Sequence, residues 1–478
     1  MRSMKKLLCI ALALCMVLGL AVSVSAEETG YTITVNSDDA HSYEVYQIFT
    51  GDLHEGVLSN VKWGENGTGE TGTEVDKAVL DALEALEGKT DKEKLAVIEG
   101  YVNLESEAFG TVGAETPINV SAGYYLLKDI GEAAPGEGLS LYIVEVVDDV
   151  TVTPKRSEVT VEKKVKDIND STETTFGDWQ DTADHDIEDE VPFKVTGTVA
   201  EDYDAYDEYF YAFHDVQCEG LTFKPETLKV YVDGAEITEG YAIVQGAEDG
   251  CTFEIVFADL KKIEAVKAGS VITCEYVSVL NEDAVLGSTG NPNEVHIEFS
   301  NNPNGEGTNR TEKDIVIVFT FMVDVDKLDN KNEELPGAGF TLYKLDAETN
   351  EYVAVGEEVW GEAMTNFQWK GVDDGMYKLE ETTTPEGYNT VDPIFFQVTA
   401  DHDIILSDDA PLNSLEGGEL FTGEVSTGAV STDVVNTPGS ELPETGGIGT
   451  YIFYTVGGLM VVGAIVFLVV RKRMGARQ

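Results

Sequence analysis

Apolar residues alternate with polar ones along most of this chain, and this period of two limits the possible folds more than any other feature. Runs such as residues 31–35 (YTITV) and 295–299 (VHIEF) place every second side chain on one face, as in a half-buried β-strand. Residues 74–101 instead repeat their apolar positions every three or four residues, which predicts a helical insert. We therefore expect a mainly β protein of tandem immunoglobulin-like β-sandwiches, with a small helical insert in the first.

The length sets the number of sandwiches. A domain commonly takes about 100–200 residues, so a chain of 478 residues has room for about three domains and its targeting segments. The pattern predicts domain boundaries at residues 27–155, 156–320 and 321–437, followed by a linker and a short motif at residues 438–446.

The N-terminus has the three parts of a signal peptide. Arg2, Lys5 and Lys6 are cationic, an apolar stretch follows, and Val24-Ser25-Ala26 provides small residues for cleavage after Ala26. We predict that residues 1–26 are removed on export. A membrane anchor is the alternative, and the small residues favour cleavage.

The C-terminus combines a short motif, an apolar segment and a basic tail. Residues 447–470 predict a transmembrane helix, because the run 451–470 is apolar and long enough to cross a bilayer. The basic tail, residues 471–478, favours the cytoplasmic side. The motif directly before this segment consists of Leu442, Pro443, Glu444, Thr445 and Gly446.

This order resembles the cell-wall sorting signal of Gram-positive surface proteins. The resemblance implies that a sortase cysteine attacks the bond between Thr445 and Gly446 and holds the threonine acyl group as a thioester until an amine releases it. Pro443 favours an extended conformation that an enzyme groove can recognise. The alternative is a permanent membrane protein with one C-terminal helix.

Residues 150–155 (VTVTPK) suggest which amine is used. They resemble the pilin motif of Gram-positive shaft pilins, although Thr153 stands where tyrosine is usual and Val146 where tryptophan often occurs. The resemblance implies that Lys155 accepts the threonine of another copy, so that copies join into a fibre. The alternative is an ordinary surface lysine beside a linker.

In the second predicted domain, three polar residues fall on faces that are otherwise apolar. Lys163 is in phase with neighbouring valines, Asp215 with Tyr211 and Phe213, and Asn301 with the run 295–299. Together they resemble the intramolecular isopeptide site of collagen-adhesin A-type domains. The resemblance implies a Lys163–Asn301 bond with Asp215 as catalyst. Lys164 and Asn302 are the alternative partners.

The third predicted domain carries a longer motif. Lys327 ends an apolar-faced strand, and residues 377–388 (YKLEETTTPEGY) match the E-box of the collagen-adhesin B-type repeat. The resemblance implies a Lys327–Asn436 bond assisted by Glu381, whereas Glu380 has the opposite parity and faces solvent. Burial favours both reactions, because a desolvated lysine becomes a neutral amine and packing holds it against its partner.

Composition narrows the function. A net charge of -58 argues against nucleic-acid binding, since phosphates would be repelled. Cys218, Cys251 and Cys274 form no clear disulfide framework; a Cys251–Cys274 bridge and buried free thiols both remain open. No catalytic spacing of histidines stands out, and the chemistry of the isopeptide sites needs no cofactor. We expect no metal, and we interpret the acidic stretch 167–170 as a solvated loop rather than a calcium site.

These expectations describe a secreted, wall-anchored structural protein rather than an enzyme. The resemblance implies as partners a pilin-specific sortase, other copies of the chain, the housekeeping sortase with cell-wall peptidoglycan, and minor tip or base pilins. A monomeric wall-anchored adhesin is the alternative function.

Overall fold

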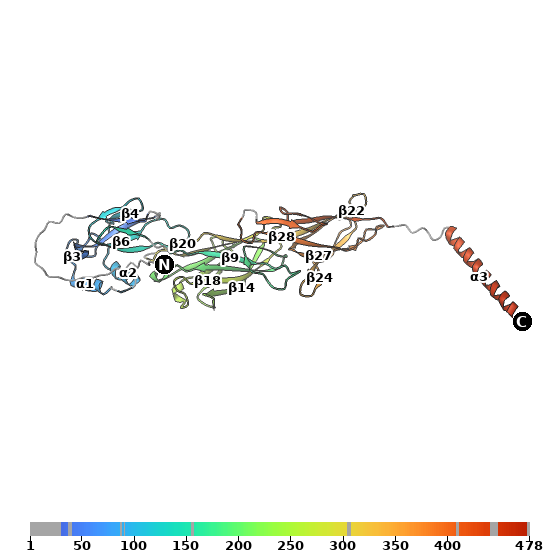
Figure 1. Cartoon of the computed structure of the whole chain (residues 1–478), viewed down its shortest axis with the longest axis horizontal. Coiled ribbons are helices and arrows are strands. Elements are labelled where there is room, and N and C mark those ends of the chain that lie inside the picture. The colour runs from blue at the N-terminus through green and yellow to red at the C-terminus, as the bar shows by residue number, and fades with distance from the viewer. Residues whose placement is uncertain are drawn as a thin grey trace, which may run out of the picture.

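The structure is a computed structural model that describes residues 30–36, 41–86, 88–89, 91–153, 157–303, 307–407, 411–439 and 448–475. It forms an elongated row of three β-rich parts that ends in a single helix (Figure 1). The predicted signal peptide, Lys155 and the sorting motif at residues 442–446 lie outside the described residues.

The first part has two sheets and the expected helical insert. The sheets have the orders β5-β1-β8 and β3-β2-β6-β7, and β4 pairs with β2. Leu83 and Ile98 of the helices pack on Phe49 and Trp63, so the insert buries its apolar face on the second sheet. The elements are β1 (Tyr31–Val35), β2 (Ser42–His54), β3 (Val57–Trp63), α1 (Lys77–Glu84), α2 (Asp91–Glu99), β4 (Gly110–Gly113), β5 (Ile118–Val120), β6 (Gly123–Asp129), β7 (Leu141–Val146) and β8 (Val150–Val152).

The second part is a sandwich of two larger sheets. Their orders are β10-β9-β12-β18-β14-β15 and β11-β21-β19-β13-β17-β16, and β20 pairs with β19. Strands β12 and β18 alternate buried and half-buried residues, as the period of two predicted. The strands are β9 (Val161–Lys166), β10 (Trp179–Gln180), β11 (Thr182–Asp184), β12 (Glu190–Thr198), β13 (Tyr211–Gln217), β14 (Leu221–Val232), β15 (Ala235–Ile237), β16 (Ala242–Gln245), β17 (Phe253–Phe257), β18 (Val271–Leu280), β19 (Asn291–Ser300), β20 (Thr308–Arg310) and β21 (Asp314–Phe319).

The third part is a smaller sandwich. Its sheets have the orders β26-β22-β31-β30 and β24-β23-β27-β28-β29, and β25 pairs with β23. Its first strand, β22, pairs in parallel with its last, β31. The strands are β22 (Phe321–Asp329), β23 (Gly339–Asp346), β24 (Glu351–Ala354), β25 (Val359–Trp360), β26 (Asn366–Val372), β27 (Gly375–Thr383), β28 (Ile394–His402), β29 (Leu412–Glu416), β30 (Thr422–Glu424) and β31 (Ala429–Asn436).

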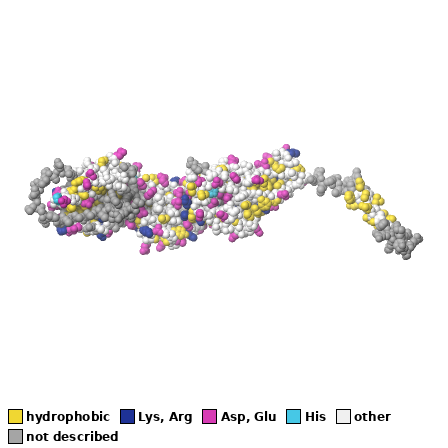
Figure 2. Space-filling view, viewed as in Figure 1, with side chains coloured by type: hydrophobic (Ala, Val, Ile, Leu, Met, Phe, Trp, Pro, Cys, Tyr) yellow, Lys and Arg dark blue, Asp and Glu magenta, His cyan; other side chains and the backbone are white. Residues whose placement is uncertain are grey.

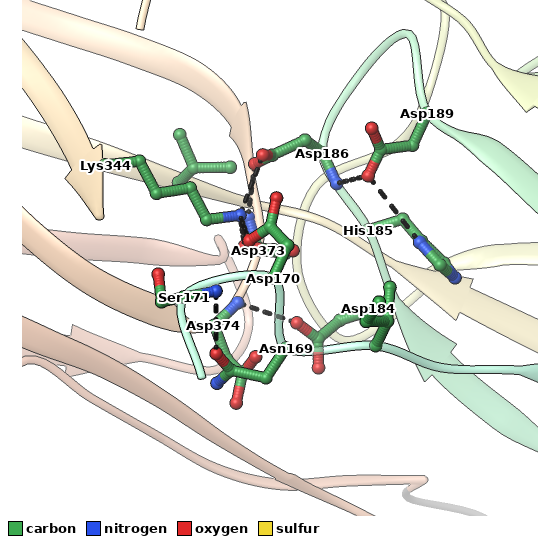
Figure 3. A network of polar contacts seen from close by, with 12 residues as sticks. Asn169, Asp170, Ser171, Asp184, His185, Asp186, Asp189, Lys344, Asp373 and Asp374 are labelled. Carbon is green, nitrogen blue, oxygen red and sulfur yellow. Dashed lines mark hydrogen bonds and ion pairs between the residues drawn. The ribbon is translucent and has the colours of Figure 1, made fainter. Parts of the chain in front are cut away.

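A buried polar network joins the second and third parts (Figure 3). Lys344 of β23 forms ion pairs with Asp186 at 2.8 Å and with Asp170 and Asp373, so one ammonium bridges carboxylates from both parts. The backbone N–H of Asp374 donates to Asp184 at 2.7 Å. Because Lys344 and Asp373 are buried, the pairing of Lys344 with carboxylates of both parts favours one relative orientation of the two sandwiches.

The helix α3 (Ile448–Gly475) follows the last sandwich. Its described side chains include exposed apolar residues such as Phe453 and Leu459. The described part of this helix has a largely yellow, hydrophobic surface in Figure 2. Within the part of the chain that the structure describes, no helix reaches the length and hydropathy needed to cross a membrane. Over the visible face of the β-rich parts, Asp and Glu side chains are widely scattered, in keeping with the acidic composition (Figure 2).

Candidate cross-linking sites

Lys163 lies in the core of the second part. It occupies the middle of β9 with its side chain fully buried, as its parity predicted. Its Nζ lies 2.6 Å from Asp215 Oδ2 on β13 and 2.5 Å from Asn293 Oδ1 on β19. A buried lysine, carboxyl group and amide therefore meet inside one sandwich.

Tyr276 of β18 completes this cluster. Its hydroxyl donates to Asp215 Oδ2 at 2.6 Å and accepts from Asn293 Nδ2 at 3.0 Å. The tyrosine thus connects the carboxyl group to the amide nitrogen. Sequence reasoning missed Tyr276; its inward parity on a strand was visible, but an inward tyrosine is ordinary in a core.

Burial changes the protonation of this cluster. It lowers the pKa of Lys163, although the carboxyl of Asp215 opposes that shift. It also raises the pKa of Asp215, against the opposing effects of Lys163 and Tyr276. Both changes favour the neutral forms, because a charge is costly to bury. A neutral amine is the form of lysine that can act as a nucleophile.

The prediction that Asn301 is the amide partner of Lys163 is wrong. Asn301 follows β19 eight residues after Asn293, which is about 26 Å at the rise of an extended strand. Its backbone instead bonds to Leu139 and Gly307, at the contact with the first part. Asn293 shares the parity of Asn301 and is fully buried, so alternation gave the correct face but not the place along it.

The alternatives to these residues do not enter the cluster either. Lys164 turns to the other face of β9, where it pairs with Asp181 at 2.5 Å. Asn302 lies directly after Asn301, nine residues along the chain from Asn293.

A second cluster lies in the third part. Lys327 of β22 is fully buried, and its Nζ donates to the carbonyl oxygens of Val434 at 3.0 Å and Leu328 at 3.2 Å. The parallel register sets Asp329 opposite Asn436, so Asn436 follows Val434 along the same face of β31. Asn436 Nδ2 donates to Glu381 Oε1 at 2.8 Å and Oε2 at 3.1 Å.

The electrostatics of this cluster also shift the lysine toward its neutral form. Burial lowers the pKa of Lys327 to about 8, although the nearby Glu381 opposes the shift. Among the described residues, Asn436 Oδ1 is buried without a hydrogen-bond partner. Glu380 points away and pairs with Lys378 at 2.9 Å, as its parity predicted. The structure thus brings Lys327, Glu381 and Asn436 together.

Lys344, in the network between the sandwiches, is a buried lysine whose charged form is favoured, in contrast to Lys163 and Lys327. Burial opposes its charge, but Asp373, Asp186 and Asp170 raise its pKa above the ordinary lysine value. It therefore stays an ammonium and holds its carboxylates together by charge. Sequence reasoning did not single out this residue, because its partners come from distant loops.

The cysteines form no disulfide within the described residues. Cys218, Cys251 and Cys274 are free thiols, so of the two states left open the structure has the unbridged one. Cys274 belongs to the core of the second part.

Two segments match known protein families. Residues 321–410 match SpaA, a prealbumin-like fold domain, and residues 434–474 match the LPXTG cell wall anchor motif. The trypsin-resistant surface T6 protein of Streptococcus pyogenes serotype M6 is 26% identical over 335 residues, 54% of this chain. The match covers 60% of that relative's length, which is less than two thirds.

One solved structure shares the architecture of this chain. The T6 backbone pilin of serotype M6 S. pyogenes, described as a modular three-domain structure, is 19% identical with a TM-score of 0.54 over 87% of this chain and 100% of that one. The full-length major pilin SpaD from Corynebacterium diphtheriae is 15% identical with a TM-score of 0.48, over 86% of this chain and 98% of that one. At these identities, the likeness to the T6 structure establishes the fold.

Proposed function

We propose that this chain is a sortase-assembled backbone pilin of the Gram-positive type, the repeating shaft subunit of a covalent surface fibre. In this proposal the carbonyl of Thr445 in one copy is joined to Nζ of Lys155 in the next. One observation carries it: a wall-anchored chain holds two fully buried lysines, Lys163 and Lys327, each in a cluster with an asparagine and a carboxyl group. The proposed domains are residues 27–155, 156–320 and 321–437, and each of the last two contains one cluster.

Each cluster is proposed to close an isopeptide bond without a cofactor. In the second domain, neutral Nζ of Lys163 attacks Cγ of Asn293, the Nζ–Cγ bond forms and the Cγ–Nδ2 bond breaks. A proton leaves Nζ and a proton reaches Nδ2, which departs as ammonia. Asp215 contacts Nζ, and Tyr276 lies between Asp215 and Nδ2, so the two together provide a route for the proton.

The third domain follows the same scheme with different residues. Lys327 attacks Cγ of Asn436, and Glu381, which already contacts Nδ2, assists the departure of ammonia. Because Lys327 and Asn436 are held on neighbouring strands, the two groups react without first having to meet by diffusion, which favours the reaction.

The positions of these bonds determine which segments bear tension. A pull that enters at Lys155 passes along β9 to Lys163, crosses to Asn293 on β19, and continues to β22. From Lys327 it crosses to Asn436 and leaves toward Thr445. Residues 164–292 and 328–435 then lie outside the stretched path, so the sandwiches resist unfolding through covalent bonds alone.

The first domain is also outside that path. Tension between neighbouring subunits enters at Lys155, which follows this domain, so residues 27–154 are a side branch of the stretched chain. A cross-link there would not strengthen the fibre. This agrees with the described residues of the first part, in which His41 and Asp129 form a buried hydrogen-bonded pair at 2.8 Å rather than a lysine cluster.

The partners follow from this assembly. We propose that a pilin-specific sortase joins the copies, and that the housekeeping sortase transfers the finished fibre to cell-wall peptidoglycan. Minor tip or base pilins are proposed as further partners.

The test is electrophoresis of surface extracts boiled in detergent. The unaltered chain should give a ladder of high-molecular-weight bands, and Lys155→Ala should reduce it to a single species. Lys128→Ala, which removes an exposed lysine of the first part, is the matched control and should keep the ladder. A single wall-linked band from the unaltered chain would instead support a monomeric adhesin.

A further inference from the structure

A second kind of polar cluster lies on the outer side of the second part, on the face of β13 opposite to Lys163. It contains His214 of β13, Glu254 of β17, and Asp249 and Cys251 from the turn between β16 and β17. One donor atom from each of these side chains lies within 4.8 Å of the other three. Nitrogen, sulfur and oxygen donors therefore converge at one place.

The strand pairing builds this cluster. His214 lies directly opposite Glu254 in the β13–β17 register, so the two side chains share a face. Asp215, the next residue, points to the opposite face and reaches Lys163. The turn then returns Asp249 and Cys251 to His214, and the N–H of Cys251 fixes the Asp249 carboxylate by donating to Oδ1 at 3.0 Å.

The spacing of the donor atoms fits a small tetrahedral ion. Ligands about 2.0–2.3 Å from zinc at the corners of a tetrahedron are about 3.3–3.7 Å from one another. His214 Nδ1 lies 3.0 Å from Asp249 Oδ2, 3.5 Å from Glu254 Oε1 and 3.5 Å from Cys251 Sγ. Cys251 Sγ lies 3.2 Å from Asp249 Oδ2. These four separations are close to tetrahedral edges.

The surroundings of the histidine also suit a ligand. His214 and Cys251 are both buried, and in the described structure His214 Nε2 has no hydrogen-bond partner. A carboxylate oxygen of Glu298 lies 3.8 Å from this Nε2. Metal-bound histidines commonly direct their second ring nitrogen toward such a carboxylate, which fixes the ring.

We propose that His214, Asp249, Cys251 and Glu254 bind a zinc ion that fastens the β16–β17 hairpin to β13. The donor types select the metal: a thiolate and an imidazole suit zinc, whereas calcium and magnesium prefer oxygen ligands alone. Binding forms bonds from the metal to the four side chains and releases the thiol proton to water. The ion would strengthen the edge of the sheet whose inner face carries Asp215 and Asn293.

The experiment uses the reduced full-length chain in detergent, stripped with a chelator and titrated with Zn²⁺ alone against a colorimetric chelator. Tight binding of one ion per chain is expected, with a rise in unfolding temperature. Co²⁺ used in place of zinc should give a thiolate charge-transfer band and the intense visible bands of tetrahedral coordination.

Variants make the assignment specific. Cys251→Ser should abolish the charge-transfer band, and Glu254→Gln, which keeps the side-chain shape, should weaken Zn²⁺ binding at least about tenfold. Cys218→Ser, which changes a half-buried thiol elsewhere in the same sandwich, should leave both unchanged. Circular dichroism checks that each variant is folded. Absence of tight binding by the unaltered chain, or equal binding by folded Glu254→Gln, would overturn the proposal.

Discussion

Nζ of Lys163 lies 2.5 Å from Oδ1 of Asn293, and this contact joins the two sheets of the second sandwich. The lysine belongs to β9 in one sheet and the asparagine to β19 in the other, 130 residues apart. A bond between them would close a loop of that length across the core. The position of this asparagine therefore determines how much of the chain the bond protects.

The first prediction concerns the identity of the asparagine. The purified protein should weigh one ammonia less for each bond formed. Asn293→Ala should remove the mass deficit that comes from the second domain. Asn301→Ala is the matched control, because it changes the same residue type on the same face, and it should keep the mass deficit. Intact-mass spectrometry with peptide mapping measures both. A deficit lost in Asn301→Ala and kept in Asn293→Ala would contradict the assignment.

The second prediction concerns the third domain. Glu381→Ala should prevent the Lys327–Asn436 bond, which closes a loop of 436 − 327 = 109 residues. By the chain-entropy relation for cross-links, losing it should lower the free energy of unfolding by about 5 kcal/mol. Calorimetry and mass spectrometry should show a lower melting transition together with a regained ammonia. Glu380→Ala, one position away and facing solvent, should change neither quantity.

The third prediction concerns the network between the sandwiches. Lys344→Met leaves the carboxylates of Asp186 and Asp373 without their shared cation, and removal of one partner of a buried ion pair typically costs about 3–5 kcal/mol. Denaturant unfolding should show this loss. Lys378→Met on the neighbouring strand removes a more exposed pair with Glu380 and should cost about 1 kcal/mol or less. Equal losses of stability in the two variants would show that the ion pairs of Lys344 contribute no more than an exposed pair.

The fourth prediction is a pH dependence from His402, which pairs with Asp184 at 3.3 Å and Asp167 at 3.6 Å. Burial opposes its charge, but hydrogen bonds to Asp167 and Asp184 raise the pKa of His402 from 6.5 to about 10. Because the folded value is the higher one, the stabilisation is complete below pH 6.5 and disappears as the pH rises to about 10.

This effect should be visible in unfolding curves recorded across that window. The unaltered chain should lose on the order of a few kcal/mol between pH 6.5 and 10, since each unit of pKa shift corresponds to about 1.4 kcal/mol. His402→Gln should be less stable at pH 6 and should have a flatter profile. A variant that keeps the full slope would assign the dependence to other groups, such as the buried His185, whose pKa is also raised.

Local pattern alone determined much of this protein. Alternation with a period of two placed Lys163, Asp215 and Lys327 in cores, and it separated Glu381 from Glu380, because the side chains of a strand alternate whatever lies beyond it. The helical insert followed from its own spacing in the same way. The anchor segment was identified from a linear motif, which can be recognised in the sequence without knowledge of the fold.

Only the tertiary structure decided which groups meet. Asn293 and Asn301 have the same parity, and the packing of β9 against β19 selects between them, a relation no local pattern contains. Lys344 gains two of its carboxylates, Asp170 and Asp186, from loops of the second sandwich. Cys251 reaches His214 through a turn and a strand register. Sequence periodicity determines the direction of a side chain, whereas its partner depends on long-range packing that aligns separate strands.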